Sequence, residues 1–474
     1  MLRDVNTIIT DGGLGVDTAK GEGIHFKIGV SPVVSDAPIV ITGSMNAKKI
    51  KEKLGLSPLA DACMDSVENG SSMIYCLPVA ASIPGTVGEV VKAGTGLGTC
   101  TVQGTPNNAY EIIVKFTGAG GFNQAVLRYS VDGGYSFSEE ITLAVNGELD
   151  IPSTGLKFVF TEDAVTPADS YKIGDTYTVK TEAPQMTNDD VLTAIDKLRT
   201  VNYSFEYVHV VGESTKALWA AISTELGRLF EIYKKPMFFV LEARNIQEGE
   251  TLDEYAQYLV NERVGLQNTD IQIVTARSLY TRMDGTVKDI NNAGIVCGLY
   301  SRAKIQQSIG EVKSFSIAEN KMLELLPRGI EDYIGLLDET KYLTFRKYEG
   351  IEGFYVTNAR MMCPDGSDYR YAEDVRVKNK IIRETRKQAL QELQSDIDME
   401  DVQGSLETIA KFILAPVDTM VRNKEISSAR IIVPEGQDIL VTEKLNVIIR
   451  FVPIGHVREI EIDIGMENPF RTQQ

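Results

Sequence analysis

The sequence predicts a multidomain α/β protein: a parallel-sheet α/β core domain with an inserted all-β domain, plus an α+β C-terminal domain with extended N- and C-terminal strand arms. At 474 residues the chain exceeds one average domain. Strand-like and helix-like runs alternate over 188–275, whereas no helical period persists between Pro84 and Pro184. The expected domains are an N-terminal arm (1–23), the core (24–85 and 186–327), the inserted domain (86–185) and the C-terminal domain (328–474).

The core domain is predicted from a β-α-β-α-β alternation that follows the insertion. Strands separated by helices of roughly 10 to 20 residues indicate a parallel sheet with crossover helices. We expect Ile39–Thr42 and Met73–Val79 to join this sheet from before the insertion. The segments after it are strands at Phe205–Val211, Met237–Glu242 and Ile271–Thr275, and helices at Lys216–Tyr233 and Leu252–Val264.

The C-terminal domain is predicted to start β-rich, up to Ala359, and to continue with helices at Ala372–Ser395 and Asp401–Val421. Val457–Ile464 then alternates with period two, which is typical of a half-buried strand. Its two sides carry Ile460, Ile462 and Ile464, and Glu459, Glu461 and Asp463.

Two arrangements of this terminal strand are open. One is a hairpin within the domain, with a strand at Leu445–Phe451 and a turn at Pro453 and Gly455. The other is pairing with a sheet edge of another copy, because the backbone groups of a terminal strand are unpaired. The glycine-flanked strand Val5–Ile9 is the corresponding N-terminal arm. The candidate residues for intersubunit strands are Val5, Ile8, Ile9, Ile460, Ile462 and Ile464.

Composition excludes several classes of partner. The net charge of −18 argues against nucleic acid and anionic membranes, since both attract basic surfaces. No apolar run approaches the roughly 20 residues that span a bilayer, and the N-terminal residues lack the pattern of a signal peptide. The five cysteines are scattered without CxxC spacing, which is typical of a reducing compartment. We therefore expect synthesis in the cytoplasm.

The sequence offers little catalytic chemistry. The three histidines, His25, His209 and His456, lie in strand-like runs, and no HExxH metal motif, GxSxG elbow or P-loop is present. We expect no catalytic residue, cofactor or metal site, and no enzymatic activity. One motif stands out: Ser130–Phe137 resembles the Asp-box hairpin of sialidase-like propellers. It is either a turn held by side-chain to backbone hydrogen bonds or part of a glycan-related site.

A basic stripe is predicted on the first C-terminal helix. Its members are spaced four, three and four residues apart, so they share one helix face; they are Arg376, Lys380, Arg383 and Lys387. Val375, Ile382, Ala389 and Leu393 form the opposite, core-facing stripe. The basic stripe is either a solvated face with ion pairs along the helix or a docking face for an acidic protein surface.

The order of these features resembles the contractile tail-sheath proteins of bacteriophages and of phage-tail-like contractile injection systems. The N-terminal matches are Ile9–Gly15, Phe26–Pro32, Pro38–Thr42 and the run from Leu59 through Asn69-Gly70 to Tyr75. An inserted β domain and a C-terminal domain with two helices before alternating strands also follow the pattern of this family. The Asp-box-bearing insertion is not universal in the family.

The resemblance implies a structural subunit that assembles as stacked hexameric rings around a tail tube. Such subunits lend terminal strands to the sheets of their neighbours, and contraction needs no cofactor because the extended state is metastable. It further implies that Arg376, Lys380, Arg383 and Lys387 dock on the tube. The implied partners are other copies in a helical homo-oligomer, the tail tube protein, and baseplate and tail-terminator proteins. Nucleic acid and membrane insertion are not implied, and the implied location is a virion tail assembled in the host bacterial cytoplasm.

Two other functions compete with the sheath interpretation. A glycan-binding or glycan-hydrolysing protein would be built on the Asp-box domain. That domain contains no tryptophan, since Trp219 lies outside it, and this argues against a sugar-stacking platform. A non-contractile tail or baseplate subunit is the second alternative.

Overall fold

The computed structural model describes residues 22–466. The chain divides into two compact units, Met1–Arg383 and Glu384–Gln474.

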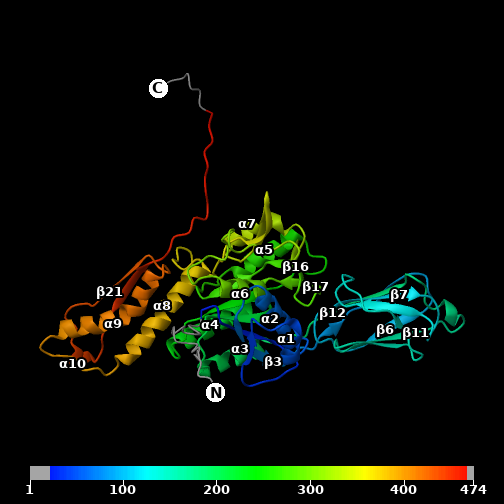
Figure 1. The fold of residues 1–474 in the computed structure, drawn as a ribbon, viewed down its shortest axis with the longest axis horizontal. Coiled ribbons are helices and arrows are strands. Elements are labelled where there is room, and N and C mark those ends of the chain that lie inside the picture. Colours follow the sequence, from blue (N-terminus) through cyan, green and yellow to red (C-terminus); the bar gives the residue numbers. More distant parts are fainter. Residues whose placement is uncertain (1–21, 467–474) are drawn as a thin grey trace, which may run out of the picture. The chain divides into compact units, whose positions relative to one another are not determined.

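A six-stranded sheet lies at the centre of the first unit (Figure 1). Its order is β15-β14-β13-β1-β3-β2, and every neighbouring pair is parallel except β2 with β3. The strands are β1 (His25–Val30), β2 (Ile39–Thr42), β3 (Met73–Val79), β13 (Tyr207–Ser214), β14 (Phe238–Ala243) and β15 (Ile271–Val274). The predicted parallel sheet is confirmed, and both early strands join it.

Helices pack against both faces of this sheet, because alternate residues of its strands enter different cores. On one face, Ile74 and Cys76 of β3 pack with α1 and α2. On the other, Phe26 and Ile28 of β1 belong to a larger core with α3, α4 and α5. The helices are α1 (Ala47–Leu54), α2 (Pro58–Glu68), α3 (Asn188–Lys197), η2 (Leu198–Thr200), α4 (Lys216–Glu231), α5 (Leu252–Arg263) and α6 (Ala293–Arg302).

Helices α2 and α6 approach each other closely at a glycine. A Cβ atom placed on Gly298 would lie 2.5 Å from the Cβ of Asn69 and 2.7 Å from the carbonyl oxygen of Ser66. Glycine is therefore required at this position for the two helices to pack as they do. The contact joins the segment before the insertion to the segment after it.

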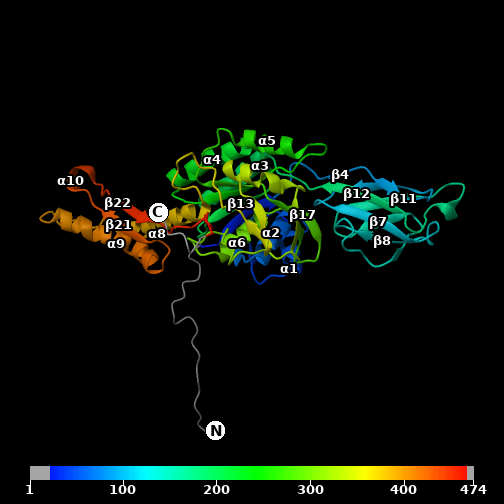
Figure 2. The ribbon, with the colours of Figure 1, turned by 90° about the horizontal axis from the view of Figure 1, so that it is seen from above.

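The inserted region has its own hydrophobic core of aromatic and branched side chains, and Figure 2 shows β12, β7 and β8 lying together in it. One sheet has the order β4-β12-β7-β8-β9, with β5 also paired to β12, and a second has the order β10-β11-β6. Its entry and exit lie side by side, because Ile83 and Gln185 exchange backbone hydrogen bonds of 3.2 and 2.9 Å. The elements are β4 (Thr86–Val87), β5 (Val91–Ala93), β6 (Thr99–Gly104), β7 (Glu111–Gly118), β8 (Val126–Ser130), β9 (Ile141–Thr142), β10 (Glu148–Ile151), β11 (Leu156–Thr161), η1 (Pro167–Asp169) and β12 (Thr176–Glu182).

Residues 328–383 belong to the first unit, although the sequence assigned them to the C-terminal domain. Side chains such as Leu343, Phe354 and Val375 are buried in the same core as the central sheet. This segment is also less β-rich than expected, since it contains a helix before its hairpin. The remaining elements of the unit are β16 (Arg277–Thr281), β17 (Val287–Asn291), β18 (Met322–Leu326), η3 (Ile330–Tyr333), α7 (Ile334–Glu339), β19 (Phe345–Tyr348) and β20 (Ile351–Val356). Helix α8 (Ala372–Gln391) spans the division between the units.

The second unit is built on α9 (Val402–Arg422), which packs against a two-stranded antiparallel sheet. The strands are β21 (Ser428–Ile432) and β22 (Ile448–Val452), and the short helix α10 (Ile439–Thr442) lies between them in sequence. Asp438 caps α10 by accepting a hydrogen bond from the Val441 amide at 3.2 Å. The partner of β22 is thus β21, not the terminal residues.

Candidate assembly site

The alternating segment Val457–Ile464 lies outside every sheet of the described chain. The intramolecular hairpin that the sequence left open is not formed. Ile460, Ile462 and Ile464 are 77%, 75% and 87% exposed, and Figure 1 shows the chain after β22 as an extended trace. A row of exposed isoleucines has no packing partner to offset the free-energy cost of its hydration.

The N-terminal candidates Val5, Ile8 and Ile9 lie outside the described residues.

The β21–β22 sheet has a half-buried face and an exposed face. Alternate residues on the half-buried face are Ala429 and Ile431 of β21 and Ile449 and Phe451 of β22. Ala429 pairs with Phe451, and Ile431 pairs with Ile449. Among residues 22–466 each strand has one strand partner, so both outer edges of this sheet are open to a further strand.

Only one end of the predicted basic stripe on α8 is exposed, and Arg376 lies at the buried end. This side chain is fully buried and forms an ion pair with the equally buried Glu206. Its Nη2 lies 3.1 Å from Glu206 Oε2 and donates to the Tyr300 carbonyl at 3.0 Å. Burial alone would raise the pKa of Glu206, but Arg376 beside it holds that pKa below its usual value. The spacing correctly placed the four cations on one face of a helix. It could not show that this face meets Glu206, which lies 170 residues earlier in the chain.

The other three cations differ in exposure. Lys380 is 7% exposed and its Nζ lies 2.5 Å from Glu22 Oε1, so it also faces inward. Arg383 is half-buried. Lys387 is exposed and pairs with Glu384 at 2.8 Å, one helical turn away. The opposite stripe is likewise mixed, because Val375 is buried whereas Leu393 is 68% exposed.

Two of the three histidines are buried in the central sheet, as expected for structural residues. Lys27, His209 and Glu242 lie on β1, β13 and β14 and form a buried row. Lys27 Nζ lies 2.6 Å from His209 Nδ1, and His209 Nε2 lies 2.8 Å from Glu242 Oε1. Burial holds the pKa of His209 well below its usual value and raises that of Glu242 to about 7. The His25 ring stacks on Tyr207 with centroids 4.8 Å apart.

A second buried charge cluster joins the inserted domain to the core. Arg282 Nε donates to Asp65 at 2.8 Å and its Nη1 donates to Asp61 at 2.5 Å. Asp61 also accepts from Asn108 of the inserted region at 2.9 Å. Lys288 lies 3.4 Å from Asp61 and donates to the Ala109 carbonyl at 3.2 Å. These charges satisfy one another, which is a structural role. No group of histidine, cysteine and acidic residues within 22–466 is arranged to hold a metal ion.

The Asp-box turn forms as its sequence predicts. Ser136 donates from its amide to Asp132 Oδ1 at 2.9 Å and from its hydroxyl to Oδ2 at 2.7 Å. The Gly134 amide donates to Ser130 Oγ at 2.8 Å. Both Ser130 and Asp132 are buried, so the polar atoms of the motif hold the turn and do not face a ligand.

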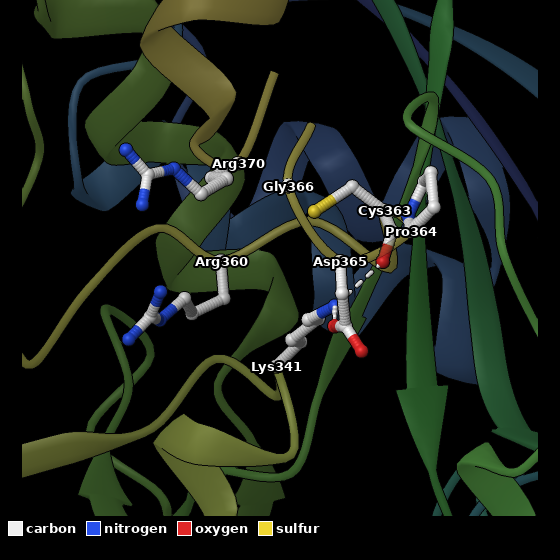
Figure 3. A pocket seen from close by; sticks show the side chains of 7 residues that line it. All are labelled: Lys341, Arg360, Cys363, Pro364, Asp365, Gly366 and Arg370. Atoms are coloured by element: carbon white, nitrogen blue, oxygen red, sulfur yellow. Dashed lines mark hydrogen bonds and ion pairs between the residues drawn. The ribbon is translucent and has the colours of Figure 1, made fainter. Parts of the chain in front are cut away.

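A pocket of about 210 Å³ lies in the first unit (Figure 3). It is lined by Lys341, Arg360, Cys363, Pro364, Asp365, Gly366 and Arg370. Lys341 Nζ pairs with Asp365 at 2.5 Å and donates to the Cys363 carbonyl at 2.8 Å. Arg360 pairs with Asp338 at 2.6 Å. The Lys341 and Arg360 side chains are therefore already held by carboxylates, and the lining contains no histidine to act as a base.

Comparison with family models assigns nearly the whole chain. The DUF2586 N-terminal domain matches residues 2–360, and the DUF2586 C-terminal domain matches residues 368–471. The chain belongs to the DUF2586 family. A comparison with curated protein sequences finds no match.

The fold of this DUF2586 chain is similar to that of contractile sheath proteins. The sheath complex of an extracellular contractile injection system, PVC, in its contracted state superposes with a TM-score of 0.55 at 10% identity, over 98% of each chain. A chain of the contracted anti-feeding prophage baseplate gives 0.50 at 11% identity, over 98% of this chain and 97% of that one. A sheath tail protein from Desulfitobacterium hafniense gives 0.49 at 10% identity, over 96% and 100%.

Two residues that the sequence interpretation missed are Arg430 and Arg450. They are direct cross-strand partners on the exposed face of β21–β22. The only available signal was that each is a single charge in the middle of an otherwise apolar or small-residue strand. That signal gains meaning only when the pairing of the two strands is known.

Proposed function

We propose that this DUF2586 chain is a structural, non-enzymatic subunit of a contractile sheath. It assembles as stacked hexameric rings around a tail tube and contracts to drive the tube through a cell envelope. The observation that carries the proposal is the exposed isoleucine row of residues 457–464, in the same unit as a two-stranded sheet with open edges. Strand addition from one copy to another would bury the isoleucine row and would pair the backbone groups at an open edge of the sheet. Similarity of fold to sheath subunits supports this proposal.

The proposed partners are further copies of the chain, a tail tube protein, and baseplate and tail-terminator proteins, in a virion tail assembled in the cytoplasm of a host bacterium. For tube docking, only the solvent-facing end of the α8 stripe is retained. Lys387 is exposed and Arg383 is half-buried, whereas Arg376 and Lys380 hold the fold of the first unit. None of the helices in residues 22–466 is long and apolar enough to cross a membrane.

Negative-stain electron microscopy and sedimentation of the purified chain test the proposal. We expect regular tubes or stacked rings whose amount rises with protein concentration. A chain that stays monomeric at all concentrations, alone and with its tube protein, would contradict the proposal. Glycan binding gains no support from the structure of the Asp-box turn, so it is not proposed as a second function.

A further inference from the structure

The larger sheet of the inserted region carries two opposed cations on its outer face. Lys115 of β7 lies directly opposite Arg128 of β8, on two strands that lie together in Figure 2. Both side chains are half-buried and point away from the core, because the residues next to them in each strand belong to that core. The carboxylate of β7, Glu111, pairs instead with Lys180 at 3.9 Å. Within residues 22–466 neither opposed cation has an ion pair, although like charges in this position destabilise a sheet.

The Asp-box turn holds one of these cations in place. The guanidinium of Arg128 lies over the ring of Phe137, with its central carbon 4.4 Å from the ring centroid. Phe137 is the aromatic residue of the Asp-box motif, whose turn is held by the hydrogen bonds of Asp132. A Cβ atom placed on Gly134 would lie 3.4 Å from Ile113 Cδ1 and 3.8 Å from Phe137 Cζ, so the turn folds over this face. The Nε atom of Arg128 is buried and has no hydrogen-bond partner among the described residues. The motif therefore positions a cation whose charge is not neutralised.

Apolar carbon and a hydroxyl group flank the two cations. Ile113 and Val126 lie two residues from Lys115 and Arg128 on the same face, and both are half-buried. Thr176 of β12 lies opposite Lys115 on its other side and is also half-buried. Neighbouring strands are about 5 Å apart, so one small molecule can meet both positive charges, the hydroxyl group and the apolar surface at once.

We infer that Lys115 and Arg128 bind the phosphate group of a phosphate monoester. Such a group carries a charge of about −1.5 to −2 at pH 7 and has three acceptor oxygens, which match two cations and the Thr176 hydroxyl. A carboxylate carries a single negative charge and would leave one cation without compensation. The flanking apolar side chains would contact the carbon skeleton of the ester. The inference goes beyond the proposed function and does not depend on it, because the site lies in a region with its own core.

Glu140 is the internal carboxylate that would compete with such a ligand. It precedes β9, whose Thr142 lies opposite Val126 of β8. Its side chain is exposed, and it forms no ion pair among residues 22–466. The two cations are therefore open to a ligand from solution in the described chain, and removal of the Glu140 charge tests this point directly.

Titration of the full chain with phenyl phosphate, followed by ligand-observed NMR at low salt, provides the test. We expect a dissociation constant on the order of 1 mM. Arg128→Gln and Lys115→Gln should each weaken binding by about tenfold, because each removes a hydrogen bond between charged groups. Lys180→Gln is the matched control, since Lys180 is exposed on the same sheet and already paired with Glu111; it should change the affinity by less than about twofold. Unchanged affinity in both Arg128→Gln and Lys115→Gln would overturn the site.

Three further probes identify the class of ligand. Inorganic phosphate lacks the ring, and benzoate keeps the ring but carries one charge; each should bind at least about threefold more weakly than phenyl phosphate. Equal affinity for inorganic phosphate would assign the cations to a free oxyanion and overturn the monoester. Equal affinity for benzoate would overturn the match of charge. Tighter binding of poly-L-glutamate, lost in Arg128→Gln, would assign the face to an acidic protein surface instead.

Two more variants test the positioning of Arg128 and the absence of an internal counter-ion. Phe137→Leu should weaken binding of inorganic phosphate by about threefold, and Phe137→Tyr should retain it, because only tyrosine keeps an aromatic face under the guanidinium. Equal binding by both Phe137 variants would overturn the positioning role. Glu140→Gln should change the affinity by less than about twofold, and a tenfold rise would show that Glu140 occupies the site. Thermal unfolding midpoints equal to that of the wild type establish that each variant is folded.

Discussion

The first unit and the end of the second unit differ in the burial and pairing of their charged and apolar side chains. In the first unit, Arg376 and Glu206 are fully buried and paired with each other. At the end of the second, Arg430 and Arg450 face water opposite one another, and the isoleucines of 457–464 are exposed. The first region pairs its charged side chains within the chain, and the second leaves these arginines and isoleucines exposed, where the proposed assembly would cover them. Stability and assembly should therefore respond to different sets of mutations.

The largest effect on stability is expected from Arg376→Ala. It removes the partner of a buried carboxylate, which typically costs about 3 to 5 kcal/mol of unfolding free energy. Urea unfolding of the monomer measures this loss. Lys387→Ala on the same helix is the control, and an exposed pair of this kind contributes about 0 to 1 kcal/mol. An equal loss of unfolding free energy in the two variants would contradict the assignment of Arg376 to a buried end and Lys387 to an exposed end of the stripe.

The next effect concerns pH and Glu242. Because the pKa of Glu242 is raised to about 7 in the folded chain, the folded state binds a proton that the unfolded state releases above its ordinary pKa of about 4.5. The stabilisation is complete below that value and is lost as pH rises through 7. Glu242→Gln should remove this dependence of the unfolding free energy on pH. Above pH 7 the variant should therefore be more stable relative to the wild type, by up to about 3 kcal/mol.

Urea midpoints of the wild type and Glu242→Gln are measured between about pH 5 and 8, which lies above the ordinary pKa of Glu and includes the raised pKa of Glu242. His209 contributes a slope of the opposite sign, since its pKa is held well below the usual value by burial. His209 contacts Glu242 directly, so the difference between the two curves reports the coupled titration of this pair. A constant difference across the range would contradict the raised pKa.

A smaller loss is expected when residues 86–185 are replaced by a short glycine-serine linker. The entry and exit of the inserted region lie side by side, and its core is separate. The remainder loses the hydrogen bond from Asn108 to Asp61 and that from Lys288 to Ala109. Deletion exposes Asp61 and Lys288 to water, which replaces the lost partners, so each hydrogen bond costs a net of about 0.5 to 1.5 kcal/mol. Thermal unfolding and electron microscopy should show a folded chain that still assembles; an unfolded product would show that the core needs the insertion.

The smallest effect on stability is expected in the terminal segment. Ile460→Ser, Ile462→Ser and Ile464→Ser together should change the unfolding free energy of the monomer by no more than about 0.5 kcal/mol, because exposed side chains add little to stability. Self-assembly should nevertheless be lost. Substituting Ile431→Ser in the half-buried face of β21 is the contrasting variant, and it should lower the unfolding midpoint.

The sequence predicted the helices and strands of the first unit better than it predicted which side chains these elements contact in the folded chain. Period-two and helical patterns located the parallel strands and the helices because these patterns are local. The burial of Arg376 was not predictable, because its partner Glu206 comes from a distant strand. The same holds for Arg430 and Arg450, whose opposition exists only once β21 and β22 are paired in the observed register. The terminal alternation was recognised, but its expected local partner, Leu445–Phe451, pairs mostly through Ile448–Val452 with β21 instead.

That pairing fixes where a decisive truncation must be made. A cut after Thr442 would remove β22 and damage the sheet of the second unit, whereas a cut after His456 leaves β21–β22 intact. The most direct measurement is sedimentation and electron microscopy of the chain ending at His456, beside a control ending at Met466. We predict that both unfold at the midpoint of the full chain, that the control assembles, and that the chain ending at His456 stays monomeric. Assembly of the shorter chain to the extent of the control would contradict the central claim that residues 457–464 link one subunit to the next.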